Sequence, residues 1–338
     1  MPALLPALVS GLVACAGDTP QTRLEDYRQR MERVLDAEPV FEVGASTLAR
    51  FPARRDLQQS AQQSQIGMLD LWAIQGCELQ RLVAQKNSSL GKVAASSTAL
   101  FYELDFLRLA PVCIAQLQGD AETELAAQLE LAVAAKQQRL PTTIWQGLLG
   151  GDENRSFWRR PASLQAYPVN PVLEADAAIA ALLVSARSWL AGDYRVDSAA
   201  IELQLQQLGR GDGGALYKSL DLQGRYLDAV NRMIDGRLAT RVLCHNTTGI
   251  KATALGNVVQ KFFIDSIQPW SVLLQARVFA ALPSLQQLEQ LLAQGEPAAY
   301  AQWRQQRDST LAKLSQAPQQ HVQTLLPLMQ QCGYNVSP

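Results

Sequence analysis

Apolar side chains recur at intervals of three and four residues along most of this chain, which is the spacing of one face of an α-helix. An early stripe of this kind follows Thr19-Pro20 and consists of Leu24, Tyr27, Met31 and Leu35. Proline is favoured in the first turn of a helix, so a helix is expected to begin there. No fixed repeat joins the later stripes, which argues against a solenoid. The sequence therefore predicts an all-α fold, an irregular multi-helix bundle.

The same spacing predicts helices over residues 66–82, 99–109, 120–141, 173–191, 197–208 and 215–244, and four shorter segments over 252–330. Proline cannot continue the backbone ladder of a helix, so Pro111 and Pro141 are expected to end the second and third of these. Asp120 is expected to cap the third. The long helix 215–244 is expected to run to Cys244, with Gly249 as its stop.

Two stretches lack the helical period. Residues 38–56 contain scattered proline and glycine and predict a short extended segment that wraps across other elements, with room for one strand at 40–43. Residues 150–171 form the longest irregular stretch and carry the aromatic pair Phe157-Trp158. We interpret residues 15–338 as a single helical domain, which the stretch 150–171 can divide into two helical halves.

The N-terminus is apolar and uncharged over residues 1–14, which is too short to span a bilayer but suits the core of a secretion signal. Leu12-Val13-Ala14-Cys15 resembles the lipobox of bacterial lipoproteins. That resemblance implies that residues 1–14 are removed and that Cys15 carries lipid, and the following Ala16 favours the outer membrane. No Lys or Arg precedes the apolar run, which departs from the usual signal. The alternative is a buried N-terminal helix with Cys15 in the core.

Composition narrows the function classes. The chain has 338 residues, a net charge of −1 and 48% hydrophobic residues, with a pI of about 6.2. These values fit a globular protein, and without a basic field we expect no nucleic-acid partner. Only two histidines are present, and the cysteine spacings match no zinc signature, so we expect no metal and no cofactor.

Four cysteines follow Cys15: Cys77, Cys113, Cys244 and Cys332. An even number in an exported chain allows two disulfides with three connectivities. We favour Cys77–Cys113 and Cys244–Cys332, which join sequence neighbours; free buried thiols are the alternative.

The first pair meets a geometric objection. In a straight hairpin that turns near Ser88, Cys113 would lie several helical turns beyond Cys77. The pair is therefore expected to need a helix break at Ala110-Pro111.

Ser89 and Lys92 stand in the pattern S-x-x-K, in which a lysine can activate a serine nucleophile, as in penicillin-binding proteins and β-lactamases. The chain lacks the accompanying S-x-N and K-T-G motifs. We therefore interpret residues 86–93 as a structural turn between helices, with polar side chains that bond to backbone groups.

Three further motifs have a structural and a functional interpretation. The glycine-rich residues 209–214 match a dinucleotide-binding pattern, but a helix precedes them, so a flexible turn between helices is expected. Cys244 and His245 are adjacent on a helix and point about 100° apart, so a catalytic pair would need His321 instead. Residues 157–160 form either an exposed aromatic and basic patch for a glycan or partner, or, as we favour, an anchor in the core.

Several stretches together resemble the proteobacterial lipoprotein family catalogued as domain of unknown function family 3080. They are residues 24–27, 34–36, 54–57, 77–79, 87–93, 100–107, 140–141 and 144–145. The resemblance implies a lipid-anchored periplasmic protein and transfers no catalytic residue.

We therefore expect a lipoprotein of the outer membrane with a non-catalytic binding or envelope-assembly role. Its partners would be the membrane, through lipidated Cys15, and an envelope protein or glycan. The alternative is a periplasmic hydrolase that acts on peptidoglycan or an acyl substrate through Ser89 and Lys92.

Overall fold

The computed structural model describes residues 18–37, 42–59, 76–87, 95–245 and 249–334. All regular secondary structure within these residues is helical. The helices are α1 (Pro20–Leu35), α2 (Arg54–Leu57), α4 (Glu78–Asn87), α5 (Ser96–Gly119), α6 (Thr123–Leu148), α7 (Asp152–Phe157), α8 (Glu174–Leu190), α9 (Ser198–Gly209), α10 (Gly213–Thr240), α11 (Ile250–Val258), α12 (Gln268–Leu291), α13 (Ala298–Ser315) and α14 (Ala317–Gln331). A π-helical segment η2 (Val259–Ile267) joins α11 to α12, and a 3-10 turn η3 (Ala293–Gly295) follows α12. The all-α prediction is confirmed.

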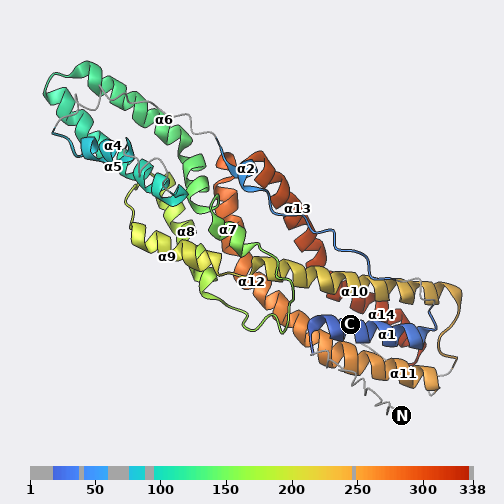
Figure 1. Ribbon diagram of the computed structural model, residues 1–338. Coiled ribbons are helices and arrows are strands. Elements are labelled where there is room, and N and C mark those ends of the chain that lie inside the picture. The colour runs from blue at the N-terminus through green and yellow to red at the C-terminus, as the bar shows by residue number, and fades with distance from the viewer. Residues whose placement is uncertain (1–17, 38–41, 60–75, 88–94, 246–248, 335–338) are drawn as a thin grey trace, which may run out of the picture.

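The helices form an elongated, irregular bundle (Figure 1). Helices α4, α5 and α6 lie at one end, α1, α10, α11 and α14 at the other, and α7, α8, α9, α12 and α13 between them. One hydrophobic core extends from Leu24 to Cys332 along the chain and includes residues on both sides of the stretch 150–171. A second, smaller core joins α4, α5 and α6 around Leu79 and Phe106.

Helix α1 begins where its sequence predicts. Thr19 caps it by accepting a hydrogen bond from the Thr22 amide, and the apolar stripe from Leu24 to Leu35 is buried. The Tyr27 ring stacks on Phe263 of η2 with 5.7 Å between ring centroids. Further along α1, Lys251 of α11 donates to the Val34 carbonyl oxygen. These contacts show that α1 runs antiparallel to α11 and η2, so its first turn lies beside the start of α12 (Figure 1).

The predicted extended segment crosses the bundle between α1 and α2. Its backbone carbonyls have no ladder partner, and four arginines between residues 155 and 232 donate to them instead. The bonds are Arg232 to Glu42 (3.1 Å), Arg225 to Gly44 (2.9 Å), Arg160 to Leu48 (3.3 Å) and Arg155 to Pro52 (3.0 Å). Glu42 and Val43 are not in a strand; the rest of the predicted strand, like the predicted helix over residues 66–75, lies outside the described residues.

Two predicted proline breaks are wrong. Helix α5 continues through Pro111 to Gly119, and α6 continues through Pro141 to Leu148. Asp120 does not cap α6; its amide closes the end of α5 by donating to the Gln116 carbonyl oxygen (3.0 Å). The two helices pack along each other as a long hairpin, and this contact offsets the roughly 3 kcal/mol that an interior proline costs a helix.

The predicted end of the long helix is also wrong. Helix α10 stops at Thr240 because Arg241 is extended, with φ −162° and ψ 154°. The chain then crosses to α14, where the Leu243 amide donates to Gln331 Oε1 (2.8 Å). A contact between distant segments, rather than the local stop signal at Gly249, therefore sets this boundary.

Candidate functional site

Three of the residues with predicted chemistry, Cys15, Ser89 and Lys92, lie outside the described residues. The lipidation site and the proposed serine–lysine pair are therefore not part of the geometry described below. The remaining candidates fall in described segments.

The four other cysteines form the two favoured disulfides. Cys77 and Cys113 have Cα atoms 5.7 Å apart, and those of Cys244 and Cys332 are 5.1 Å apart. The expected break at Pro111 is unnecessary because the hairpin of α4 and α5 is centred near residue 95 rather than at Ser88. Lys86 and Glu103, which form an ion pair (2.7 Å), also lie about equally far before and after residue 95. Cys77 thus lies opposite Cys113 while α5 stays continuous.

The glycine-rich segment is a closely packed turn between α9 and α10. A Cβ atom at Gly213 would lie 2.1 Å from the Phe157 ring, and one at Gly214 would lie 2.3 Å from the Arg159 carbonyl oxygen. The glycines therefore allow the backbone to approach the segment after α7, rather than a phosphate. Phe157 and Trp158 are buried. They anchor this segment in the core, and the alternative of an exposed aromatic patch is wrong.

The two histidines form no catalytic pair with Cys244, whose sulfur is in a disulfide. His245 is exposed, whereas His321 is fully buried. His321 Nε2 lies 2.8 Å from the Tyr27 hydroxyl, and its Nδ1 lies 2.5 Å from Asn231 Oδ1. Because the Asn231 oxygen only accepts, Nδ1 carries the proton and the Tyr27 hydroxyl donates to Nε2.

This order of groups resembles a nucleophile, a base and an orienting residue, but it is sealed from solvent. Burial lowers the pKa of His321 to about 3 and raises the pKa of Tyr27 far above its usual value. A neutral, inaccessible imidazole cannot exchange protons with a substrate at neutral pH. We therefore interpret the three residues as a structural link between α1, α10 and α14.

A buried ion cluster joins α8, α10 and α12. The Arg277 side chain is 0% exposed and pairs with Asp176 (2.7 Å) and Asp212 (2.7 Å). Tyr167 also donates to Asp212 (2.8 Å). Hydrogen bonds from the guanidinium to both carboxylates raise the Arg277 pKa although burial opposes this. The cluster is fully paired, so it holds three helices together and offers no free group to a ligand.

A second buried cluster joins α12 and α13. Arg307 forms an ion pair with Glu289 (2.6 Å), and the Tyr300 hydroxyl donates to the same carboxylate (2.6 Å). The Arg307 guanidinium lies 4.6 Å from the Trp158 ring centroid. Glu289 raises the pKa of Arg307, against the effect of burial. A lone charge inside an apolar stripe, as at Arg277 and Glu289, is the sequence signal for such clusters, but it does not identify the partner.

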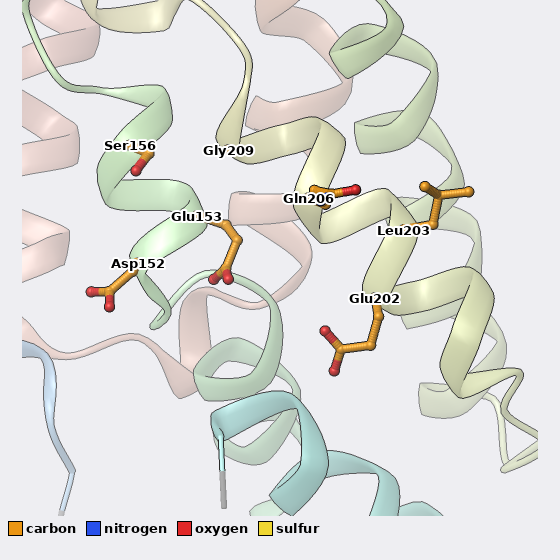
Figure 2. Close-up of a pocket in the computed structure, with 7 residues that line it drawn as sticks. All are labelled: Asp152, Glu153, Ser156, Glu202, Leu203, Gln206 and Gly209. Atoms are coloured by element: carbon orange, nitrogen blue, oxygen red, sulfur yellow. The ribbon is translucent and has the colours of Figure 1, made fainter.

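The groove between α7 and α9 has the chemistry of a surface binding site (Figure 2). It has a volume of about 500 Å³ and is lined by Asp152, Glu153, Ser156, Glu202, Leu203, Gln206 and Gly209. Glu153 and Glu202 extend their carboxylates into the space between the two helices, whereas Asp152 points to the other side of α7. A Cβ atom at Gly209 would lie 3.4 Å from the Glu153 Cα atom, an ordinary van der Waals contact, so α7 and α9 pack directly on each other here.

The groove is electrostatically unbalanced. Asp152 pairs with Arg54 (3.4 Å) and lies 3.8 Å from Arg155. Glu153 and Glu202 have no cationic partner within the part of the chain that the structure describes. No cluster of at least three His, Cys, Asp or Glu side chains in the described ranges could hold a metal ion. Two uncompensated carboxylates beside a hydroxyl and an amide therefore favour an organic cation, such as an amino or guanidinium group.

Sequence reasoning missed this groove. Glu153 and Glu202 are far apart along the chain and belong to helices whose local patterns show only ordinary polar faces. The packing of α7 against α9 alone brings their carboxylates to one groove.

No helix of the described residues is both long and apolar enough to cross a membrane. The search of curated proteins gave no match, and the search of solved structures gave none. A family model described as a protein of unknown function, DUF3080, matches residues 24–336, and the chain belongs to this family.

Proposed function

We propose that this protein is a lipid-anchored lipoprotein on the periplasmic side of the outer membrane, with a non-catalytic binding or envelope-assembly role. Two features of the chain support the location. Leu12-Val13-Ala14-Cys15 has the form of a lipidation signal, and the two disulfides suit an oxidising compartment.

The observation that supports a binding role is the groove between α7 and α9. It is open, carries two carboxylates without cationic partners, and is lined by no imidazole or thiol. Carboxylates on a rigid helical frame bind a cationic group well, whereas hydrolysis would need an activated nucleophile beside a base. The proposed partner is therefore an envelope protein or glycan that presents an amino or guanidinium group.

The competing hydrolase hypothesis has no support from the described residues. Ser89 and Lys92 lie outside them, and the one hydrogen-bonded series that resembles a catalytic triad, at His321, is fully buried. We therefore do not adopt it as a second function.

Site-specific photocrosslinking in intact envelopes tests the binding role. A photoreactive residue replaces Leu203, which lines the groove and is 57% exposed, and in a control strain it replaces Leu131 on α6, which is 72% exposed. We expect one defined adduct from position 203 that is lost in the Glu153→Gln/Glu202→Gln variant. No adduct, or an adduct that survives the double substitution, would contradict the role assigned to the groove.

The anchor has its own test. Cys15→Ser should prevent incorporation of labelled palmitate and release the protein from the membrane fraction or stall its processing. Palmitate that still enters the Cys15→Ser protein would show that another residue carries the lipid.

A further inference from the structure

The middle of helix α12 exposes apolar side chains, whereas Gln268 and Gln286 are exposed towards its two ends. Val272, Leu273 and Phe279 are 63%, 44% and 75% exposed. Pro283 is also exposed, and Val272, Phe279 and Pro283 recur at helical spacing, so they share one face. Apolar side chains that are exposed together on one face often mark a contact surface, so this face is expected to have a partner.

Charged residues are excluded from this face. From residue 266 to residue 288 the chain carries a single charged side chain, Arg277, and it is fully buried and paired. Exposed surfaces of water-facing helices usually carry interspersed charges. The absence of charge over this length favours contact with an apolar medium rather than with a charged protein surface.

The loop before α8 packs against the opposite, buried side of α12. Trp270 donates to the Tyr167 carbonyl oxygen (2.8 Å), and Arg277 donates to the Pro171 carbonyl oxygen (3.4 Å), so residues 167–171 lie along α12. We call the exposed apolar residues of the helix itself, Val272, Leu273, Phe279 and Pro283, the α12 face.

The described part of the chain that leads to Cys15 begins level with the start of α12. Tyr27 lies against Phe263, and α1 runs antiparallel to η2. Seven residues back along α1, at about 1.5 Å per residue, Pro20 reaches the level of the first turn of α12. Figure 1 shows the start of α1 beside the junction of η2 and α12. Cys15 precedes Pro20 by five residues, which span at most about 18 Å.

We propose that the α12 face lies on the bilayer into which the lipid of Cys15 inserts, so that the protein has a fixed orientation on its membrane. This inference rests on the proposed lipidation of Cys15. A short tether keeps the face within reach of the lipid surface, and an uncharged, weakly protruding apolar face suits the boundary between headgroups and acyl chains.

The test uses full-length lipidated protein reconstituted into vesicles of phosphatidylethanolamine and phosphatidylglycerol with brominated acyl chains. An environment-sensitive fluorescent amino acid replaces Val272 in one preparation and Leu131 in another. We expect quenching by the brominated lipid at position 272 and none at position 131. Phe279→Lys should reduce the quenching at position 272 by about twofold or more, and Leu131→Lys should leave it unchanged. Both substituted side chains are exposed, so neither change is expected to affect folding.

Two readouts separate this proposal from the one on which it rests. The mass of the N-terminal peptide reports lipidation directly, and an unmodified Cys15 would overturn both proposals. A lipidated, vesicle-bound protein whose position 272 is not quenched would overturn the membrane face alone. A fluorescence change at position 272 that depends on protein concentration, and occurs without vesicles, would also overturn the membrane face. It would indicate contact with a second copy of the chain.

Discussion

The buried His321 predicts a specific loss of stability in acid. Its imidazole is neutral in the folded protein, where burial lowers the pKa to about 3, against 6.5 in an exposed peptide. Below pH 6.5 the unfolded chain binds a proton at this residue that the folded protein does not bind. The free energy of unfolding therefore falls as the pH drops from 6.5 towards 3, and the contribution of His321 is fully present only above pH 6.5.

The magnitude follows from the two pKa values. Near pH 5 the unfolded state gains about 2 kcal/mol from protonating this imidazole, while the folded state gains almost nothing. His321→Gln removes the titration while keeping a side chain that can hydrogen-bond. The free energy of unfolding of this variant should be about 1–3 kcal/mol lower than that of the wild type at neutral pH, because the glutamine forms poorer hydrogen bonds to Tyr27 and Asn231. When the pH falls from neutral to about 5, the free energy of unfolding of the variant should decrease by about 2 kcal/mol less than that of the wild type.

Urea unfolding followed by circular dichroism at several pH values measures this difference. The carboxylates titrate alike in both proteins, so subtracting the two pH profiles isolates His321. The chain has only one other histidine, His245, and it is the same in both proteins that are compared. Equal pH profiles in the wild type and His321→Gln, or a native-state NMR titration of His321 near pH 6.5, would refute the reasoning.

Three further predictions concern the packing at Gly213, the disulfides and the S-x-x-K motif. Gly213→Ala should lower the melting temperature markedly, because its Cβ would lie 2.1 Å from the Phe157 ring, and a melting temperature equal to wild type would contradict this contact. Alkylation of protein unfolded without reductant should find no free thiol among the four cysteines after Cys15, whose two disulfides should each stabilise by about 2–4 kcal/mol; four alkylated cysteines would contradict it. A labelled β-lactam or fluorophosphonate should form no adduct, and Ser89→Ala should shift only the melting temperature, whereas an adduct at Ser89 that is lost in Lys92→Ala would place the protein among the enzymes.

The sequence by itself determined the fold class and the apolar face of each helix. The stripe from Leu24 to Leu35 predicts α1 and its buried side because a period of three to four residues is a local property of the chain. The irregular composition of residues 38–56 likewise predicts an extended wrap, which the structure shows over residues 42–53 before α2 begins at Arg54. The favoured disulfide pairs agree with the structure, although the helix break at Ala110-Pro111 expected for the first pair is absent.

The tertiary structure alone decided the helix ends, the buried charge pairs and the groove. Local rules end a helix at Pro111 or Pro141, yet the packing of α5 along α6 outweighs the local cost of each proline. Periodicity shows which face of a helix is apolar but not which helix covers it, so the pairing of Arg277 with Asp176 and Asp212 cannot be deduced from spacing. The groove of Glu153 and Glu202 and the uncovered α12 face arise for the same reason, since both depend on which surfaces of distant segments meet and which are left exposed.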